Sequence, residues 1–203
     1  MQKIVLSTGN QDKVRELRQM MDEEKFQVLS KNDLGLGDLE IEETGRTLND
    51  NAEIKVIELY KALKAKGEDP DQYWILADDT GLFVPAIRNL PGVYSARYAG
   101  ENATYEDNIQ KLLKRMTGLE MGDRNAYFLT VIAVIKKGEL FEYQGRLEGR
   151  ILEEERGEGG FGYDPVFYVI DQGKTLAEMT LEEKNQISHR SQAFRSFLGD
   201  IHE

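Results

Sequence analysis

Apolar positions along this chain follow two alternating patterns. A short β-branched run at residues 4–6 predicts a buried strand. Apolar residues then recur every three to four positions, at Val14, Leu17 and Met20 or Met21, which predicts an amphipathic helix. Asn10 stands where a side chain would cap that helix. A strand, a loop of small residues and a helix in this order present backbone N–H groups to an anion.

The same two patterns continue along the rest of the chain. Strands are predicted at residues 26–29, 74–77, 126–135, 139–146 and 166–170, with a hairpin turn at Lys137-Gly138. Helices are predicted to begin after Thr47, Thr104, Thr180 and Ser188, and residues 90–92 are predicted to form a turn. The buried stripe of the last helix is expected to be Phe194, Phe197, Leu198 and Ile201. This mixture indicates an α/β or α+β protein.

Length and composition narrow the kind of site that the chain can build. Its 203 residues fit a single domain, 1–203, with room for two lobes and a sizeable core. The chain has no cysteine, which excludes disulfides, thiolate nucleophiles and cysteine-bound zinc. Its two histidines, His189 and His202, are too few for a multi-histidine metal cluster. A metal site would therefore use oxygen ligands, which suit Mg²⁺ or Mn²⁺.

The charge balance argues against a nucleic-acid partner. The 26 basic and 37 acidic residues give a net charge of −11, whereas duplex-binding proteins are normally basic. A nucleotide substrate remains compatible with this charge, because local lysines and a metal can carry the phosphates. Residues 1–7 do not resemble a signal peptide and no apolar stretch is long enough to span a bilayer. We therefore expect a soluble, cytoplasmic protein without a membrane partner.

Three segments in the N-terminal half are candidates for phosphate and metal chemistry. Residues 7–13 place a hydroxyl, a glycine and an amide before a helix, with Lys13 one turn in, without the spacing of a Walker A loop. Asp78-Asp79 follows an apolar strand, where one carboxylate could bind a metal while the other orients or deprotonates water. Glu42-Glu43 and Lys55 could add a metal ligand and a phosphate contact. The alternatives are a capped helix, a turn-forming pair and a solvated acidic surface.

Two segments in the C-terminal half are candidates for binding a flat heterocycle. Residues 159–165 surround two aromatic rings and one carboxylate with glycines, so a base could stack on a ring and donate to Asp164. The alternative is a glycine-rich turn whose aromatic residues lie in the core. His189 and Arg190 fall in the first turn of a helix, where cations oppose the helix dipole unless an electron-rich group binds there. The alternative is a satisfied core histidine beside a surface arginine.

In combination these segments resemble one family, the non-canonical purine nucleoside triphosphate pyrophosphatases, also called inosine/xanthosine triphosphate pyrophosphatases. The resemblance extends over nearly the whole chain and rests on six motifs in register. They are Ser7-Thr8-Gly9-Asn10 through Lys13, Glu42-Glu43-Thr44-Gly45, Ala77-Asp78-Asp79-Thr80-Gly81-Leu82, residues 91–98, residues 160–165 and Ile187-Ser188-His189-Arg190. The chain departs from the commonest pattern at Thr80, where serine is usual, at residues 49–51 and at Ser191-Gln192.

The resemblance implies a fold and a reaction. The fold is α/β, elongated and two-lobed, with a mixed twisted sheet flanked by helices and an active-site cleft between the lobes; a homodimer is also implied. The reaction is the Mg²⁺-dependent hydrolysis of ITP, dITP or XTP to the monophosphate and pyrophosphate, with Mn²⁺ as a possible substitute. Two alternatives are a Maf-type pyrophosphatase for pyrimidine or modified nucleotides and a catalytically silent nucleotide-binding module.

The resemblance also implies roles for individual residues. Asp79 and Asp78 match the catalytic positions, with their division of roles open, and Glu42 and Asp79 match the metal-binding positions. The substrate-binding positions correspond to Thr8, Gly9, Asn10, Gln11, Asp12, Lys13, Lys55, Thr80, Phe161, Gly162, Tyr163, Asp164, Lys184, His189 and Arg190. Donors such as His189 and Arg190 would favour a base with an oxygen at C6 and leave buried donors unpaired against adenine.

Overall fold

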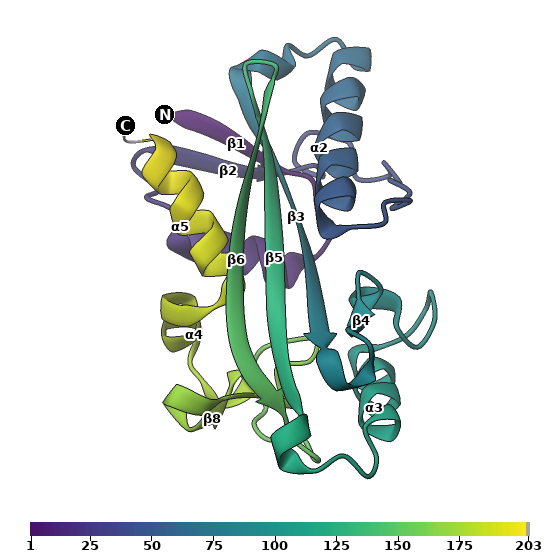
Figure 1. The fold of residues 1–203 in the computed structure, drawn as a ribbon. Coiled ribbons are helices and arrows are strands. Elements are labelled where there is room, and N and C mark those ends of the chain that lie inside the picture. Colours follow the sequence, from purple (N-terminus) through teal and green to yellow (C-terminus); the bar gives the residue numbers. More distant parts are fainter. Residues whose placement is uncertain (202–203) are drawn as a thin grey trace. The chain divides into compact units, whose positions relative to one another are not determined.

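The computed structural model describes residues 1–201, and the side chain of Ile201 lies outside the described residues. The strands are β1 (Gln2–Leu6), β2 (Phe26–Ser30), β3 (Tyr73–Val84), β4 (Leu90–Gly92), β5 (Asn125–Lys136), β6 (Glu139–Ile151), β7 (Phe167–Val169) and β8 (Lys174–Thr175). The α-helices are α1 (Gln11–Met20), α2 (Leu48–Ala65), α3 (Tyr105–Arg115), α4 (Leu181–Ile187) and α5 (His189–Ile201) (Figure 1). The elements predicted from the two apolar patterns are all present.

The strands form one mixed sheet in the order β2-β1-β3-β5-β6-β7-β8, with β4 paired to β3. β1 lies parallel to both β2 and β3, with Leu6 opposite Ser30 and Leu76. β4 pairs antiparallel with β3, and β7 pairs antiparallel with both β6 and β8. The prediction of an α/β protein with a mixed sheet flanked by helices is therefore confirmed.

The chain divides into two compact units. Unit 1 comprises Met1–Asp79, Thr130–Gln144 and the chain from Ala193 onward, and unit 2 comprises Thr80–Leu129 and Gly145–Gln192. The three long strands β3, β5 and β6 each contribute residues to both units. β3 passes from unit 1 to unit 2 between Asp79 and Thr80.

Each unit has its own apolar core. In unit 1, β1, α1 and the part of α5 from Ala193 onward share a cluster that includes Ile4, Leu17, Leu76, Ile132, Phe194 and Phe197. Figure 1 shows α2 beside the unit 1 part of β3, where Ala52, Val56, Leu59 and Leu63 form its fully buried face. In unit 2, the cluster includes Leu82, Ile109, Leu112, Phe128, Phe167 and Leu176. Both units therefore bury a helix face at the predicted three- to four-residue spacing.

The helix starts agree with the capping residues predicted from the sequence. Thr47, Thr104 and Thr180 each accept a hydrogen bond from the backbone N–H three residues later. The acidic side chain at that later position accepts in turn from the backbone N–H of the threonine. Ser188 caps α5, since its Oγ accepts from Ser191 N at 3.1 Å. These reciprocal bonds satisfy N–H groups that would otherwise lack a partner inside the helix.

The sequence-based placement of Asp78 and Asp79 at the end of a strand is wrong. β3 continues through both residues to Val84, because Leu82–Val84 find a partner in β4. Pairing with β1, however, stops at Leu76, two residues before the first aspartate. The two carboxylates therefore lie within a continuous strand but beyond the parallel strand beside it.

The turn predicted at residues 90–92 is a strand instead. Leu90–Gly92 forms β4, and the reversal lies one segment earlier, at Pro85–Ile87 and the two following residues. Arg88 and Asn89 both adopt positive φ, at 63° and 59°, which turns the chain back onto β3. Proline is accommodated in β4 because an edge strand tolerates a residue that cannot donate.

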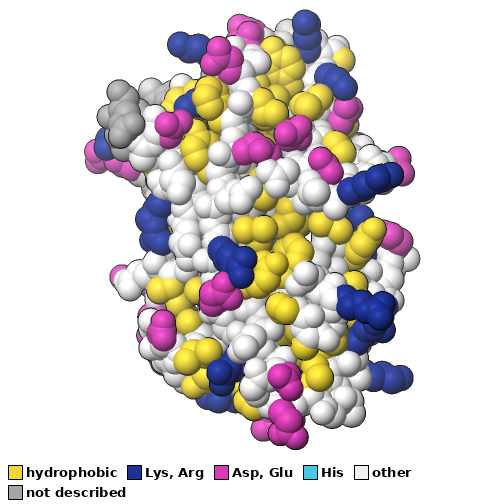
Figure 2. Space-filling view, in the orientation of Figure 1, with side chains coloured by type: hydrophobic (Ala, Val, Ile, Leu, Met, Phe, Trp, Pro, Cys, Tyr) yellow, Lys and Arg dark blue, Asp and Glu magenta, His cyan; other side chains and the backbone are white. Residues whose placement is uncertain are grey.

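Charged side chains of both signs are interspersed over the face shown in Figure 2. Among residues 1–201, none of the helices has the length and apolar character needed to cross a bilayer.

Removing the hydroxyl of Thr104 tests the contribution of one capping box. Thr104→Ala should lower the free energy of unfolding by about 1 kcal/mol, because Asp107 N loses its acceptor. Thr117, just after the same helix, makes only a 3.5 Å contact to a carbonyl and provides the control. Urea unfolding should show Thr117→Ala much closer to the unchanged protein; equal losses in the two variants would contradict the capping interpretation.

Candidate active site

Hydrogen bonds to α2 and to the first residues of α1 hold the loop after β1 in place. Ser7 Oγ donates to Lys55 O at 3.0 Å, which ties the loop to α2. Asn10 Oδ1 accepts from Asp12 N at 2.9 Å and Lys13 N at 3.3 Å, and Asn10 N donates to Thr8 Oγ1. A phosphate bound by the N–H groups of Asp12 and Lys13 would therefore replace the Asn10 side chain.

Each aspartate of the buried pair meets a lysine of unit 1. Lys13 Nζ lies 3.0 Å from Asp78 Oδ2, and Lys55 Nζ lies 2.9 Å from Asp79 Oδ1. Asp78 and Asp79 are only 3% and 7% exposed, so each carboxylate is buried together with a lysine that replaces part of its lost hydration. The two lysines come from different helices, α1 and α2, although the aspartates are adjacent in β3.

Lys55 joins the aspartate pair to the acidic loop. Its Nζ also lies 3.2 Å from Glu43 Oε1 and donates to Asp78 O at 3.3 Å. Burial by itself would lower the pKa of the Lys55 ammonium, but the charges of Asp79 and Glu43 and the hydrogen bond to Asp79 outweigh it and raise the pKa. Lys55 is therefore a charged group at neutral pH and neutralises carboxylates from two segments.

The carboxylates around Lys55 fit a magnesium ion in their chemistry. Magnesium prefers oxygen ligands, and it usually takes one or two protein carboxylates together with substrate phosphates and water. Asp79 and Glu43 supply that number, whereas the side chain of Glu42 is exposed. Within residues 1–201 no group of three or more acidic or histidine side chains is assembled for a metal.

In unit 2, the glycine-rich loop folds around the carboxylate of Asp164. Asp164 Oδ2 accepts from Phe161 N at 2.9 Å and from Lys184 Nζ at 2.6 Å. Gly160 makes this possible, because its φ is 72° and a Cβ there would lie 2.1 Å from Asp164 Oδ2. Asp164 and Lys184 are each 3% exposed, so the loop closes over a buried ion pair.

Phe161 presents its ring to two cations. Lys184 Nζ lies 4.5 Å and Arg190 Cζ 5.5 Å from the ring centroid, which is within cation–π range. Arg190 is 2% exposed, and its Nη2 donates to Thr80 Oγ1 at 3.2 Å. The alternative of a surface arginine at this position is therefore wrong. Phe161 itself is only partly buried, and its ring also lies 6.1 Å from that of Tyr105, between centroids.

A ring contact and a hydrogen bond position two more of the predicted side chains of this region. The His189 imidazole stacks on Phe128, with 4.5 Å between ring centroids and 20° between planes. Tyr163 OH donates to Ser95 O at 2.8 Å, and burial raises the pKa of Tyr163 well above its usual range. The Tyr163 side chain thus anchors the loop to residues 95–97 and is committed to the protein interior.

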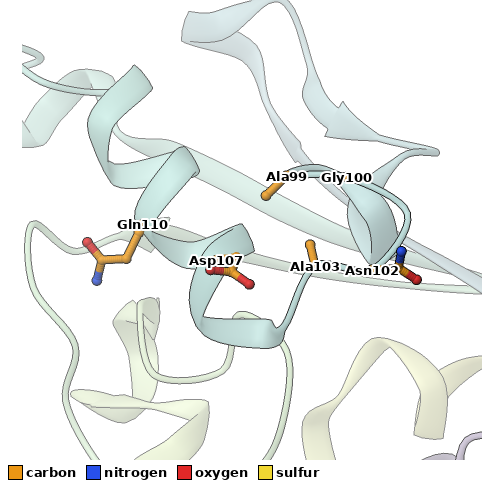
Figure 3. A pocket seen from close by; sticks show the side chains of 6 residues that line it. All are labelled: Ala99, Gly100, Asn102, Ala103, Asp107 and Gln110. Carbon is orange, nitrogen blue, oxygen red and sulfur yellow. The ribbon is translucent and has the colours of Figure 1, made fainter.

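A separate surface pocket of about 470 Å³ lies at the start of α3 (Figure 3). It is lined by Ala99, Gly100, Asn102, Ala103, Asp107 and Gln110, none of which is a predicted site residue. The carboxylate of Asp107 in this lining accepts hydrogen bonds from Thr104 N and Oγ1 and is therefore part of the cap of α3.

The structure groups the predicted residues into two sets. Unit 1 brings together Lys13, Lys55, Asp78 and Asp79, with the loop residues Thr8, Gly9, Asn10, Gln11 and Asp12 before Lys13. Unit 2 brings together Thr80, Phe161, Gly162, Asp164, Lys184 and Arg190, with Tyr163 and His189 packed behind.

Sequence reasoning named Glu43 only as part of an acidic segment and did not select Asn51. It selected Glu42 as the metal ligand, but the contact to Lys55 comes from Glu43, and two adjacent glutamates carry no signal that separates them. Asn51 Nδ2 donates to Asp79 Oδ2 at 3.2 Å. Its spacing of four residues from Lys55 on one helix was a usable signal, since residues four apart share a face.

Comparison with known proteins identifies the class to which this fold and these residues belong. The model of the Ham1 family matches residues 4–200, and the chain belongs to this family. Among solved structures, the Staphylococcus aureus Ham1 protein is 37% identical with a TM-score of 0.84 and 98% of each chain covered. A HAM1 protein from Coxiella burnetii is 36% identical with a TM-score of 0.85, covering 100% of this chain and 99% of that one.

Relatives with named activities are similar over almost the full length. The dITP/XTP pyrophosphatase of Thermoanaerobacter sp. (strain X514) is 50% identical over 191 residues, which are 94% of this chain and 92% of the relative. The dITP/XTP pyrophosphatase of Bacillus subtilis (strain 168) is 41% identical over 196 residues, covering 96% and 94%.

The buried pair in unit 2 should matter far more for stability than an exposed pair. Lys184→Met leaves the buried Asp164 carboxylate without its cation and should lower the free energy of unfolding by about 3 kcal/mol or more. Lys174→Met removes the exposed pair to Glu183 and should cost less than about 1 kcal/mol. Chemical unfolding of the two variants tests this difference, and similar losses would show that Asp164 does not depend on Lys184.

Proposed function

We propose that this protein hydrolyses non-canonical purine nucleoside triphosphates, ITP, dITP and XTP, to the monophosphate and pyrophosphate. The observation that carries the proposal is the pair of buried aspartates, each held by a lysine next to a loop suited to phosphates. Membership of the Ham1 family and the activity named for its relatives support the same reaction. The protein is accordingly a nucleoside triphosphate pyrophosphatase, and its reaction removes abnormal nucleotides from the pool.

Unit 1 supplies the groups for the phosphates. Lys13 and Lys55 are charged donors next to the loop of Thr8 to Asp12, and the N-terminus of α1 adds a favourable dipole. In the free protein both ammonium groups are held by carboxylates, so a triphosphate would compete with Asp78 and Asp79 for them. This arrangement keeps buried positive charge neutralised until an anionic substrate arrives.

Asp79 is proposed as the metal-binding carboxylate, together with an acidic residue of the 42–43 loop. Magnesium held there would neutralise phosphate charge and help activate water for in-line attack at phosphorus. Glu43 meets Asp79 through the shared Lys55 ammonium, so it is a candidate ligand beside the predicted Glu42. Asp78 is then the carboxylate that orients the attacking water, and manganese would substitute because it prefers the same oxygen ligands.

Unit 2 supplies the groups for the base. The partly exposed ring of Phe161 offers a stacking face, while Lys184 and Arg190 beside it are donors that suit the oxygen at C6 of hypoxanthine and xanthine. An adenine amine would leave such donors unpaired in a buried site, which is a strong basis for rejection. Tyr163 and Asp164 shape the loop that carries this ring.

The two alternative functions are less well supported. A Maf-type enzyme typically has an arginine where this chain has Lys13, and it lacks the loop of Phe161 to Asp164. A silent binding module does not require two buried carboxylates with lysine partners, which are costly to maintain. We further propose that residues 1–203 act as one catalytic domain, as a cytoplasmic homodimer. The active-site cleft that the family resemblance implies also stays a prediction.

The first test is pyrophosphate release from ITP, XTP, dITP, GTP, ATP, dTTP and UTP, with and without Mg²⁺. We expect magnesium-dependent release from ITP, dITP and XTP and little from ATP or GTP. Preference for dTTP or UTP would instead favour a Maf-type activity, and tight binding without turnover would favour a binding module.

Asp79→Asn is the active-site control for that assay. It should abolish turnover because the metal-binding charge is lost, while circular dichroism remains that of the folded protein. Turnover close to that of the unchanged protein would remove Asp79 from the catalytic assignment.

We further propose that His189, which matches a base-binding position of the family, contributes to base selectivity together with Lys184 and Arg190. His189→Ala should lower the ratio of kcat/KM for ITP to kcat/KM for ATP by about tenfold or more, because one buried donor to the base oxygen is lost. The measurement is kcat/KM for both nucleotides under the same Mg²⁺ concentration. An unchanged ratio would limit His189 to its packing on Phe128.

A further inference from the structure

A fully buried amide connects the two carboxylate segments of unit 1. Asn51 is 0% exposed and lies in the first turns of α2. Its Nδ2 donates to Asp79 Oδ2 at 3.2 Å, and its Oδ1 accepts from Gly45 N at 2.9 Å. The orientation of the amide follows from its partners, since a backbone N–H requires the oxygen and a carboxylate requires the nitrogen. The Asn51 side chain thus connects the Asp79 carboxylate to the backbone of the loop at Gly45.

On one side, Asn51 helps to fix the plane of the Asp79 carboxylate. The terminal torsion of an aspartate is broad, so packing of the Cβ alone does not set where the oxygens point. Lys55 donates to Oδ1 and Asn51 donates to Oδ2, each from the same face of α2. With one donor on each oxygen, rotation of the carboxylate would break a buried hydrogen bond.

On the other side, Asn51 holds the acidic loop against the helix. Gly45 follows Glu43 by two residues, and a Cβ at Gly45 would lie 2.5 Å from Asn51 Oδ1 and 2.5 Å from Asp50 Cβ. The loop can approach so closely only because residue 45 is glycine. Asp50 adds a second attachment, because its Oδ2 accepts from the N–H groups of Arg46 and Thr47.

We infer that Asn51 is a positioning residue, which aligns Asp79 and the 42–45 loop for the metal and phosphates of the substrate. The inference rests on the proposed function, because it concerns the carboxylates assigned to that site. Residues that orient metal-binding carboxylates act through the ligands, and their loss typically lowers metal affinity or activity about 10–100-fold. Asn51 itself touches neither the substrate nor the reacting atoms in this assignment.

The test separates orientation of Asp79 from anchoring of the loop. Asn51→Asp keeps an acceptor for Gly45 N but replaces the donor to Asp79 by a second carboxylate, whereas Asn51→Ala removes both contacts. Asn49 provides the matched control, since its Nδ2 also donates to a carboxylate, Glu142, at 2.9 Å and 3.0 Å on the same helix. Asn49→Asp and Asn49→Ala report the general cost of each substitution.

Two measurements decide the inference: Mn²⁺ affinity of the nucleotide-free protein by electron paramagnetic resonance, and kcat and KM for ITP. We expect Asn51→Ala to bind Mn²⁺ about 10–100-fold more weakly than Asn49→Ala. We expect Asn51→Asp to lose a similar factor in kcat relative to Asn49→Asp, with a much smaller change in KM for ITP. A purely structural Asn51 would be replaced by aspartate without loss of kcat, because the Gly45 contact survives.

Either Asn51 variant behaving like its Asn49 control would overturn the inference. If Asn51→Ala fails to give a cooperative thermal transition, Asn51→Asp alone decides, since it retains the anchor to the loop. If the unchanged protein releases no pyrophosphate from ITP, the proposed function fails, and Mn²⁺ affinity still tests the role of Asn51 separately.

Discussion

Burial of charge in pairs is the constraint on which both sets of site residues depend. Asp78, Asp79, Asp164, Lys55 and Lys184 are all nearly inaccessible to solvent. A buried carboxylate or ammonium is tolerated only when an opposite charge or several hydrogen-bond donors replace the lost water. Each of these groups has such a partner at 3.0 Å or less. The loops and helices around them are arranged so that the partners meet, and glycines stand where the approach is closest.

The two units stabilise their buried charges with the same kind of local structure. In unit 1, Gly45 lets the acidic loop approach Asn51, which in turn donates to Asp79. In unit 2, Gly160 lets the loop close on Asp164, which accepts from Lys184. In both cases a glycine without a Cβ allows a backbone segment to reach a polar side chain, and a lysine from a helix neutralises the carboxylate. The buried charges of both sets are therefore neutralised within the protein itself.

Much of the fold and part of the site could be predicted from the sequence, and the errors have a common origin. Caps at Asn10, Thr104 and Thr180 were predicted correctly because capping is decided within four residues. The strand at Leu90–Gly92 was missed because only its pairing with β3, several residues away, makes it a strand. The contact between Glu43 and Lys55 could not be predicted for the same reason, since it depends on how a loop folds onto α2. Glu42 as a metal ligand stays a prediction.

The sequence by itself determined the α/β class, the helix starts and the set of charged residues in the chain, whereas a metal bound by oxygen ligands and the residues for phosphates and base stay predictions. Those properties follow from periodicity, local hydrogen bonding and composition, which need no knowledge of distant neighbours. Only the tertiary structure decided which lysine meets which aspartate, that Arg190 is buried against Phe161, and that Asn51 bridges Gly45 and Asp79. The reason is that such pairs join residues far apart in the chain, and their distances are set by packing of whole elements rather than by local spacing.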